Sequence, residues 1–118
     1  MSNPTGPPYT PVVVADGWLV VSGQVGLGES GLVTGGFEAE LRQALANLQA
    51  RLAEHGATLA DVVKTTVFVR HLSTDYPRLN ELYLATFAEP RPARSAIGVA
   101  ELPLGALVEI EAWAHVGP

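Results

Sequence analysis

The most informative segment for the architecture is Val108-Glu109-Ile110-Glu111-Ala112-Trp113-Ala114-His115, near the end of the chain. Successive side chains of an extended strand point to opposite faces of a sheet, so the alternation divides this segment into two faces. One face is apolar and is formed by Val108, Ile110, Ala112 and Ala114. The other mixes carboxylates with aromatic rings and is formed by Glu109, Glu111, Trp113 and His115. The pattern predicts a strand over Leu107–His115, in a sheet whose apolar face is covered by helices.

Two helices are predicted before this strand. From Phe37 onward, leucines recur at helical spacing at Leu41, Leu45, Leu48 and Leu52. Gly56 follows them as a C-terminal stop. A second helix is expected to begin at Ser73 or Thr74, either of which can cap it, with Pro77 in its first turn. Its apolar side is formed by Leu79, Leu82, Tyr83 and Phe87, and Pro90 and Pro92 follow its end.

Four more strands complete the prediction. Val12–Val14 and Trp18–Ser22 flank the turn residues Asp16-Gly17, which is typical of a hairpin. The glycine-rich residues 23–36 that follow are expected to form a bulged loop. The segment Val62–Arg70 alternates, with one face formed by Val63, Thr65, Val67 and Val69. The last of the four, Arg94–Val99, is joined to the final strand by a turn through Pro103 and Gly105.

The same two-residue period assigns the faces of the Arg94–Val99 strand. We expect Arg94, Ala96 and Gly98 on the face that carries Glu109. The opposite face, formed by Ser95, Ile97 and Val99, is expected to meet the core. The small neighbours of Arg94 would leave space for a ligand beside its side chain.

The order of these elements predicts an α+β fold with one domain over residues 1–118. Both helices are expected to cover one face of a mixed sheet in a two-layer sandwich, and a chain of 118 residues suits a single core. The second face would expose Trp18, Phe68 and Trp113 beside Arg94 and the two glutamates. Such a face is too apolar for open water and too charged for a core. We therefore expect a subunit interface that contains a polar cleft.

The composition argues against several kinds of partner and site. Twelve acidic residues against seven basic ones give a net charge of −5, which disfavours a nucleic-acid partner. The chain has no cysteine, and so no disulfide, thiol nucleophile or cysteine metal site. The proline-rich start, Met1–Tyr9, lacks the features of a secretory signal, and no apolar run is long enough to span a membrane. We expect a cytoplasmic protein without a membrane partner.

Arg94, Glu109 and Glu111 are the candidate functional residues that patterning alone provides. A guanidinium can hold a carboxylate through two parallel hydrogen bonds, and a glutamate in a partly dry cleft can act as a general acid or base. The same residues are compatible with a structural ion pair across an interface. Patterning leaves both interpretations open.

Other constellations give less support to a site. Gly23, Gly26 and Gly28 lack the spacing of a nucleotide-binding loop. The three histidines, His55, His71 and His115, have no partner at ligand spacing, so we assign no metal. Ser22 and Ser95 have no histidine placed to activate them, which argues against a serine nucleophile.

Several segments together resemble a known family. They are Ser22-Gly23-Gln24, Asp61–Val69, Asn80 with Tyr83, Pro92–Val99, Leu102-Pro103 and Val108–Ala112. These segments are similar to the signature of the Rid (YjgF) family, the reactive intermediate deaminases, and the similarity extends over nearly the whole chain.

The resemblance implies a chorismate-mutase-like fold assembled as a homotrimer, with clefts at the subunit interfaces. It also implies cofactor-independent hydrolysis of C=N bonds in reactive enamines and imines, such as 2-aminoacrylate, 2-iminobutanoate and 2-iminopropanoate, to 2-oxo acids and ammonia. Arg94 matches the family's carboxylate-binding arginine, and Glu109 the glutamate that positions or activates water. The residues that fall where the family lines its cleft are Tyr9, Ser22, Gly23 and Ala96.

Three positions depart from the family pattern. Ala96 stands where many relatives carry cysteine, so no thiol-dependent role is transferred. Pro11 replaces a frequent polar residue, and the segment from Tyr83 to Arg94 is shorter than usual; both changes bear on the substrate range. The alternative function is a non-catalytic trimer that binds a 2-oxo acid. Endoribonuclease activity, attached to some relatives, is disfavoured by the acidic charge balance.

Overall fold

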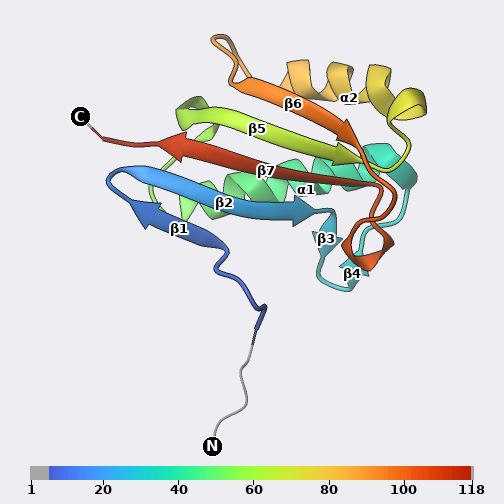
Figure 1. The fold of residues 1–118 in the computed structure, drawn as a ribbon, viewed down its shortest axis with the longest axis horizontal. Coiled ribbons are helices and arrows are strands. Elements are labelled where there is room, and N and C mark those ends of the chain that lie inside the picture. The colour runs from blue at the N-terminus through green and yellow to red at the C-terminus, as the bar shows by residue number, and fades with distance from the viewer. Residues whose placement is uncertain (1–5, 118) are drawn as a thin grey trace, which may run out of the picture.

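The computed structural model describes residues 6–117, so the first five residues of the Met1–Tyr9 segment lie outside it. The elements follow the order β1 (Val12–Ala15), β2 (Trp18–Val25), β3 (Leu27–Gly28), β4 (Gly31–Leu32), α1 (Gly36–Ala53), β5 (Val62–Val69), α2 (Leu72–Thr86), β6 (Ala93–Gly98) and β7 (Val108–His115) (Figure 1). Single 3-10 turns lie at Leu59–Asp61 and Pro103–Gly105. Within residues 6–117, no helix is long and apolar enough to cross a membrane.

The main sheet has five strands in the order β1-β2-β7-β5-β6 (Figure 1). β5 and β6 are parallel and the other neighbouring strands are antiparallel, so the sheet is mixed, as predicted. The parallel pair follows from the topology, because α2 forms the crossover between β5 and β6. The predicted α+β class is confirmed. β6 is not a neighbour of β7, however, because β5 lies between them.

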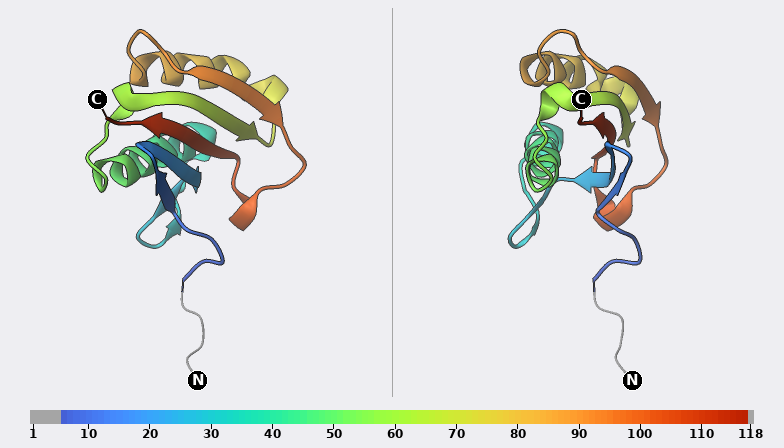
Figure 2. Two further views of the ribbon diagram at one scale, coloured as in Figure 1. Left: turned by 60° about the vertical axis from the view of Figure 1, so that its left-hand side comes forward. Right: turned by 90° about the vertical axis from the view of Figure 1, so that its left-hand side faces the viewer.

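Both helices pack on one face of the sheet (Figure 2). α1 lies against β2 and β7, and α2 lies beside α1 and β6. The predicted apolar stripes of the two helices are buried, and the largest fully buried side chains include Leu19, Leu41, Leu48, Leu52, Leu79, Phe87 and Ile110. On β7 the alternation holds throughout, because Val108, Ile110, Ala112 and Ala114 are all buried. The opposite face of the sheet carries Trp18, Trp113 and Ile97, which are 38%, 47% and 44% exposed.

The N-terminal hairpin forms as predicted, with Asp16 and Gly17 both at positive φ in its turn. The prediction of a loop over residues 23–36 was incomplete. β2 continues to Val25, and a small second sheet pairs β3 with β4 before α1 begins. The predicted bulge is present, and it lies in β2 between Val21 and Gln24.

The inner face of β5 differs from the prediction at its start. Val62 is buried and Val63 is 43% exposed, whereas the alternation had placed Val63 inside. An irregularity between Val62 and Lys64 in the pairing with β7 is the physical reason, because one extra residue reverses the facing of the side chains before it. From Thr65 onward the predicted faces are correct.

The start of α2 was also predicted incorrectly. The helix begins at Leu72 directly after β5, with His71 at the N-cap position and no side-chain cap. Leu72 packs against the core and fixes this early start. Pro77 consequently lies inside the helix instead of in its first turn.

The faces of β6 are the reverse of those expected. β6 pairs in parallel with β5 so that Arg94 lies beside Thr65 and Ala96 beside Val67, and these two β5 residues are fully buried under the helices. Arg94 and Ala96 therefore face α2, whereas Ser95 and Ile97 lie on the open face. The prediction that Ser95, Ile97 and Val99 form core was wrong for Ser95 and Ile97, which are exposed, while Val99 is half-buried after the strand ends.

Candidate functional site

A groove of about 610 Å³ lies on the open side of the sheet and contains four of the predicted site residues. We call it the Glu109 groove; it is lined by Pro7, Pro8, Tyr9, Ser22, Gly23, Val25, Leu27, Pro103, Leu104, Glu109 and Glu111. Tyr9 comes from the segment before β1, Ser22 and Gly23 from β2, and Glu109 from β7. These residues therefore line one groove together with Glu109 within a single chain, and their roles in a site remain predictions.

The β2 bulge shapes the floor of this groove. A Cβ atom on Gly23 would overlap Glu109 Oε2, so a larger residue at this position would displace the carboxylate. Ser22 fixes the adjacent wall with two hydrogen bonds: its Oγ donates to Thr10 O at 2.7 Å and its N–H donates to Pro11 O at 2.9 Å. These bonds hold Tyr9 at the mouth, where the residue is 57% exposed.

Glu109 has an environment that favours its protonated form. Its burial raises the pKa of the carboxyl group above its usual range, and the negative charge of Glu111 on the same strand face raises this pKa further. A glutamate with a raised pKa holds its proton closer to neutral pH, which suits a group that exchanges protons with a bound molecule.

Arg94 lies in a second cavity, on the helix side of the sheet. This Arg94 cavity has a volume of about 380 Å³ and is lined by Asn80, Tyr83, Leu84, Arg91, Pro92 and Arg94. Arg94 Nη2 donates to Asn80 Oδ1 at 2.8 Å and to Tyr76 Oη at 3.4 Å. Arg94 Cζ also lies 4.8 Å from the centre of the Tyr83 ring. These contacts leave other N–H groups of the guanidinium available to a ligand.

The Tyr83 ring is held in place by a hydrogen bond to a residue of β5. Its hydroxyl lies 2.7 Å from Thr65 Oγ1, in a buried hydrogen bond between α2 and β5. Burial raises the pKa of Tyr83, and this outweighs the hydrogen bond to Thr65 and the nearby Arg94 charge, which both act in the opposite direction. The ring therefore stays neutral and provides a rigid apolar surface for the guanidinium.

Within one chain, the structure does not bring Arg94 and Glu109 together. Glu109 is on the open face and Arg94 is on the helix face of the edge strand, with β5 between their strands. The expectation of a shared face was wrong because the register of β6 reverses its facing. Ala96 lies on the same face as Arg94, packed against the core, and Glu111 lies in the Glu109 groove.

Three contacts of Arg94 had no role in the predicted site. Asn80 and Tyr83 belonged to the resemblance without an assigned role, and Tyr76 was not singled out. The signal was present, because Tyr76, Asn80 and Tyr83 are spaced by four and three residues and so lie on one helix face. Among residues 6–117, no group of three or more histidine, aspartate or glutamate side chains is placed to hold a metal ion.

Comparison of the sequence and structure with those of known proteins identifies the family to which the chain belongs. The model of the family described as Endoribonuclease L-PSP matches residues 2–116. The structure of RidA from the Antarctic bacterium Psychrobacter superposes with a TM-score of 0.89 at 37% identity, covering 96% of this chain and 92% of that one. The chain belongs to the Rid family. The predicted resemblance is therefore confirmed.

Two curated Rid relatives are similar over most of their length. The human protein named 2-iminobutanoate/2-iminopropanoate deaminase is 42% identical over 113 residues, covering 94% of this chain and 82% of that protein. The mouse protein of the same name is 45% identical over 113 residues, covering 94% and 83%.

Proposed function

We propose that this Rid protein is a cofactor-independent hydrolase of 2-imino acids that works as a homotrimer. In this arrangement the Arg94 cavity of one subunit meets the Glu109 groove of its neighbour. The observation that carries the proposal is that the Arg94 cavity and the Glu109 groove lie on opposite faces of one sheet, and we call them the two half-sites. Each half-site has what the other lacks, because one provides a cation for a carboxylate and the other a raised-pKa carboxyl group.

The open face supports the assembly. Trp18 and Trp113 meet edge to face at 6.1 Å on this face, which also carries exposed Ile97. Large apolar side chains gathered on one sheet face are stabilised by covering them with another subunit. The one-domain organisation and the cytoplasmic location expected from the sequence remain part of this proposal.

The chemistry follows from the two half-sites. Arg94 binds the substrate carboxylate, and the backbone N–H of Ala96 is placed to add a hydrogen bond. Val99 N–H donates to Val69 O on the neighbouring strand β5. The N–H groups of successive residues in a strand point alternately to its two sides, so the N–H of Ala96 points to the free edge of β6. Such a clamp holds the imine carbon in one position for attack by water.

Glu109 manages the protons of the hydrolysis. In its ionised form Glu109 takes a proton from the water that adds to the C=N carbon and passes this proton to the nitrogen, which gives a carbinolamine. The carboxylate then takes the proton of the new hydroxyl group and delivers it to the nitrogen as the carbon–nitrogen bond breaks, which gives a 2-oxo acid and ammonia. Tyr9 and Ser22 shape the entrance, and the reaction as written needs no electron transfer.

The test is the decay of freshly generated 2-iminobutanoate, followed by ammonia release. We expect wild-type protein to accelerate it on the order of 10²-fold or more. Arg94→Ala should lower kcat/KM by about 10²-fold, whereas Arg42→Ala, a surface arginine on α1 paired with Glu38, should match wild type. An unchanged decay rate with wild-type protein, where a known family deaminase accelerates it, would contradict the proposal.

A binding protein for 2-oxo acids is the alternative that the Arg94 cavity also supports. It predicts that 2-oxobutanoate raises the melting temperature in an Arg94-dependent manner while imine decay is unaffected. Endoribonuclease activity, named for the family model, is opposed by the net charge of −5. RNA that stays intact after incubation with the protein without metal would exclude endoribonuclease activity.

A further inference from the structure

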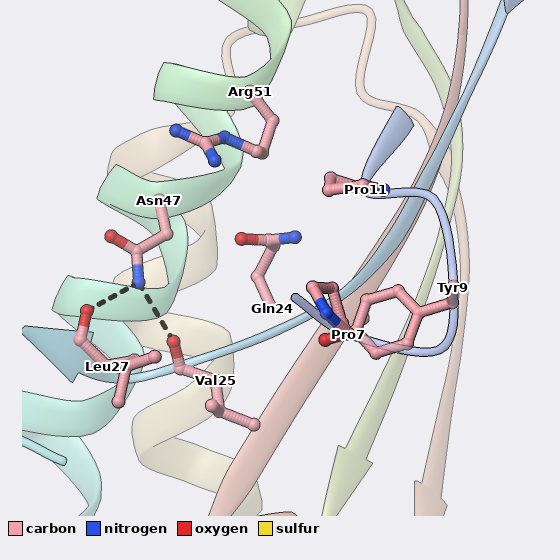
Figure 3. Close-up of a pocket in the computed structure, with 9 residues that line it drawn as sticks. Pro7, Tyr9, Pro11, Gln24, Val25, Leu27, Asn47 and Arg51 are labelled. Atoms are coloured by element: carbon pink, nitrogen blue, oxygen red, sulfur yellow. Dashed lines mark hydrogen bonds between the residues drawn. The ribbon is translucent and has the colours of Figure 1, made fainter. Parts of the chain in front are cut away.

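A third cavity lies between the edge of β2 and the side of α1, behind residues 7–11, which we call the Tyr9 segment (Figure 3). Its volume is about 270 Å³, and it is lined by Pro7, Tyr9, Pro11, Gly23, Gln24, Val25, Leu27, Asn47 and Arg51. We call it the Arg51 cavity. The residues that it shares with the Glu109 groove are Pro7, Tyr9, Gly23, Val25 and Leu27. The Tyr9 segment is therefore a partition between two cavities.

The wall formed by α1 is held in place by Asn47. Its Nδ2 donates to Val25 O and to Leu27 O, each at 3.0 Å, so the end of β2 and β3 are tied to the helix (Figure 3). Gln24 extends into the space between α1 and the Tyr9 segment (Figure 3). Its Nε2 donates to Ser22 O at 3.0 Å, which leaves its carbonyl oxygen on the side of the helix.

Arg51 is the one formal charge among the residues that line this cavity, and its hydrogen bonding is incomplete. One Nη2 bond of 2.7 Å joins it to Glu54, in a pair whose side chains are 34% and 52% exposed. A pair this exposed contributes little stability. Arg51 Nε is enclosed, and it has no acceptor within residues 6–117. An enclosed donor without an acceptor is costly, so a small reorientation of the guanidinium toward an anion would stabilise it.

We propose that the Arg51 cavity binds a small monocarboxylate, with Arg51 as its counter-charge and the proline, valine and leucine side chains around its short hydrocarbon part. The contrast with the neighbouring groove supports an anion: the Glu109 groove is lined by two glutamates and no cation, whereas the Arg51 cavity is lined by one cation and no carboxylate. Its volume is at the lower end of ligand sites, which fits a molecule of few atoms.

The two cavities are coupled through their common wall. Ser22 holds the Tyr9 segment with two hydrogen bonds, and a carboxylate behind this segment changes the position in which Tyr9 faces the groove. Coupling between two sites is reciprocal, so occupancy of the groove also changes affinity at Arg51. This second step, unlike the binding itself, rests on the proposed function of the groove.

The experiment is a titration of ¹⁵N-labelled full-length protein with propanoate, followed by NMR. The side-chain amide of Gln24 reports on the Arg51 cavity, and that of Asn80 reports on Arg94, to which it is bonded. We expect both amides to shift in wild type, with dissociation constants of about millimolar. Arg51→Ala and Arg51→Gln should abolish the Gln24 response and retain that of Asn80, while Arg94→Ala should do the reverse. Arg42→Ala should retain both.

The outcomes separate the two proposals. A Gln24 response that persists in both Arg51 variants overturns the second site, whatever happens at Asn80. A missing Asn80 response with an Arg51-dependent Gln24 response contradicts the proposed function and leaves the second site standing. Inorganic phosphate that binds at Arg51 as tightly as propanoate overturns the assignment to carboxylates. An affinity at Asn80 that differs less than about twofold between wild type and Arg51→Ala overturns the coupling.

Discussion

Arg94 is oriented by its neighbours before any ligand arrives. The Tyr83 ring lies under the guanidinium, and Asn80 Oδ1 accepts a hydrogen bond from one Nη atom at 2.8 Å. A long arginine side chain would otherwise lose rotamer freedom on binding a carboxylate. The contacts made by α2 reduce this loss, so the fork is pre-organised for a planar acid.

Asn80 is therefore expected to be a positioning residue, which two substitutions can test. Asn80→Ala removes one hydrogen bond and should raise KM about three- to tenfold with little change in kcat. Asn80→Asp keeps an acceptor in place but adds a negative charge beside Arg94, which competes with the substrate carboxylate. We expect Asn80→Asp to raise KM more than Asn80→Ala does in steady-state kinetics. Equal effects of the two changes would contradict a role in carboxylate binding and indicate a purely structural one.

Glu109 provides a prediction about stability and pH. Its pKa is raised on folding above the ordinary 4.5, so the unfolded chain releases this proton at lower pH than the folded protein does. As pH rises through this range, ionisation of Glu109 destabilises the fold, and the loss is complete above the folded pKa. Glu109→Gln should therefore gain melting temperature relative to wild type as the pH rises above the ordinary pKa of 4.5, by a few degrees at most because the side chain is partly exposed.

Thermal unfolding of both proteins across this pH range checks the sign. Glu101→Gln, which removes an exposed glutamate outside the groove, controls for the change in net charge. A melting temperature that falls with pH in Glu109→Gln relative to wild type would show that burial of the carboxylate is not the dominant effect.

At the scale of the elements, the sequence predicts a strand best where one face meets a core. β7 alternates in the structure as it does in the sequence, because its apolar residues all lie under helices. The two faces of β6 were predicted the wrong way round because its largest apolar residue, Ile97, faces away from the core of its own chain. The small residues of β6 instead face α2, and a Cβ atom on Gly98 would lie 3.4 Å from Leu72 Cβ. A pattern cannot distinguish apolar residues buried in a core from those that cover another surface.

The site residues were predictable to a similar extent. Tyr9, Ser22 and Gly23 were placed with Glu109 from family resemblance, and the structure unites them in one groove. Their separation from Arg94 could not be read from the sequence, because it depends on the register of β6 against β5. The Arg51 cavity combines residues from three distant segments, and no periodicity in the chain indicates such a meeting.

The β2 bulge leads to a prediction about Gly23. Alanine is allowed by the backbone there, but its Cβ would collide with the Glu109 carboxyl end, which is the flexible part of that side chain. Gly23→Ala should therefore displace the carboxylate and lower kcat/KM about 10- to 100-fold while the melting temperature changes little. Gly28→Ala, whose Cβ would meet Val33 Cγ1 at 3.2 Å and Gly31 O at 3.7 Å, is the matched control and should keep its activity. Wild-type kinetics in Gly23→Ala would argue against a role for Glu109 in the reaction.

At the scale of the whole molecule, the open face of the sheet leads to a prediction about assembly. Trp113 is 47% exposed in the single chain and meets the Trp18 ring on this face. Trp113→Glu should leave the far-UV circular dichroism native-like and yield monomers at micromolar concentration in light scattering, where wild type is expected to be a trimer. Ala46→Glu, on an exposed position of α1, should remain a trimer. A monomeric wild type would remove the basis for the composite cleft.

The placement of Arg94 and Glu109 on opposite faces of the sheet has a genetic consequence. If each cleft takes its arginine from one subunit and its glutamate from the next, two defective alleles can complement each other. Equal co-expression of Arg94→Ala and Glu109→Ala chains should form a population of pure and mixed trimers in which about a quarter of all clefts have both residues intact. We expect these mixtures to recover about that share of wild-type imine hydrolysis, although each allele alone retains little activity. Mixtures that stay inactive would mean that both residues act within one chain.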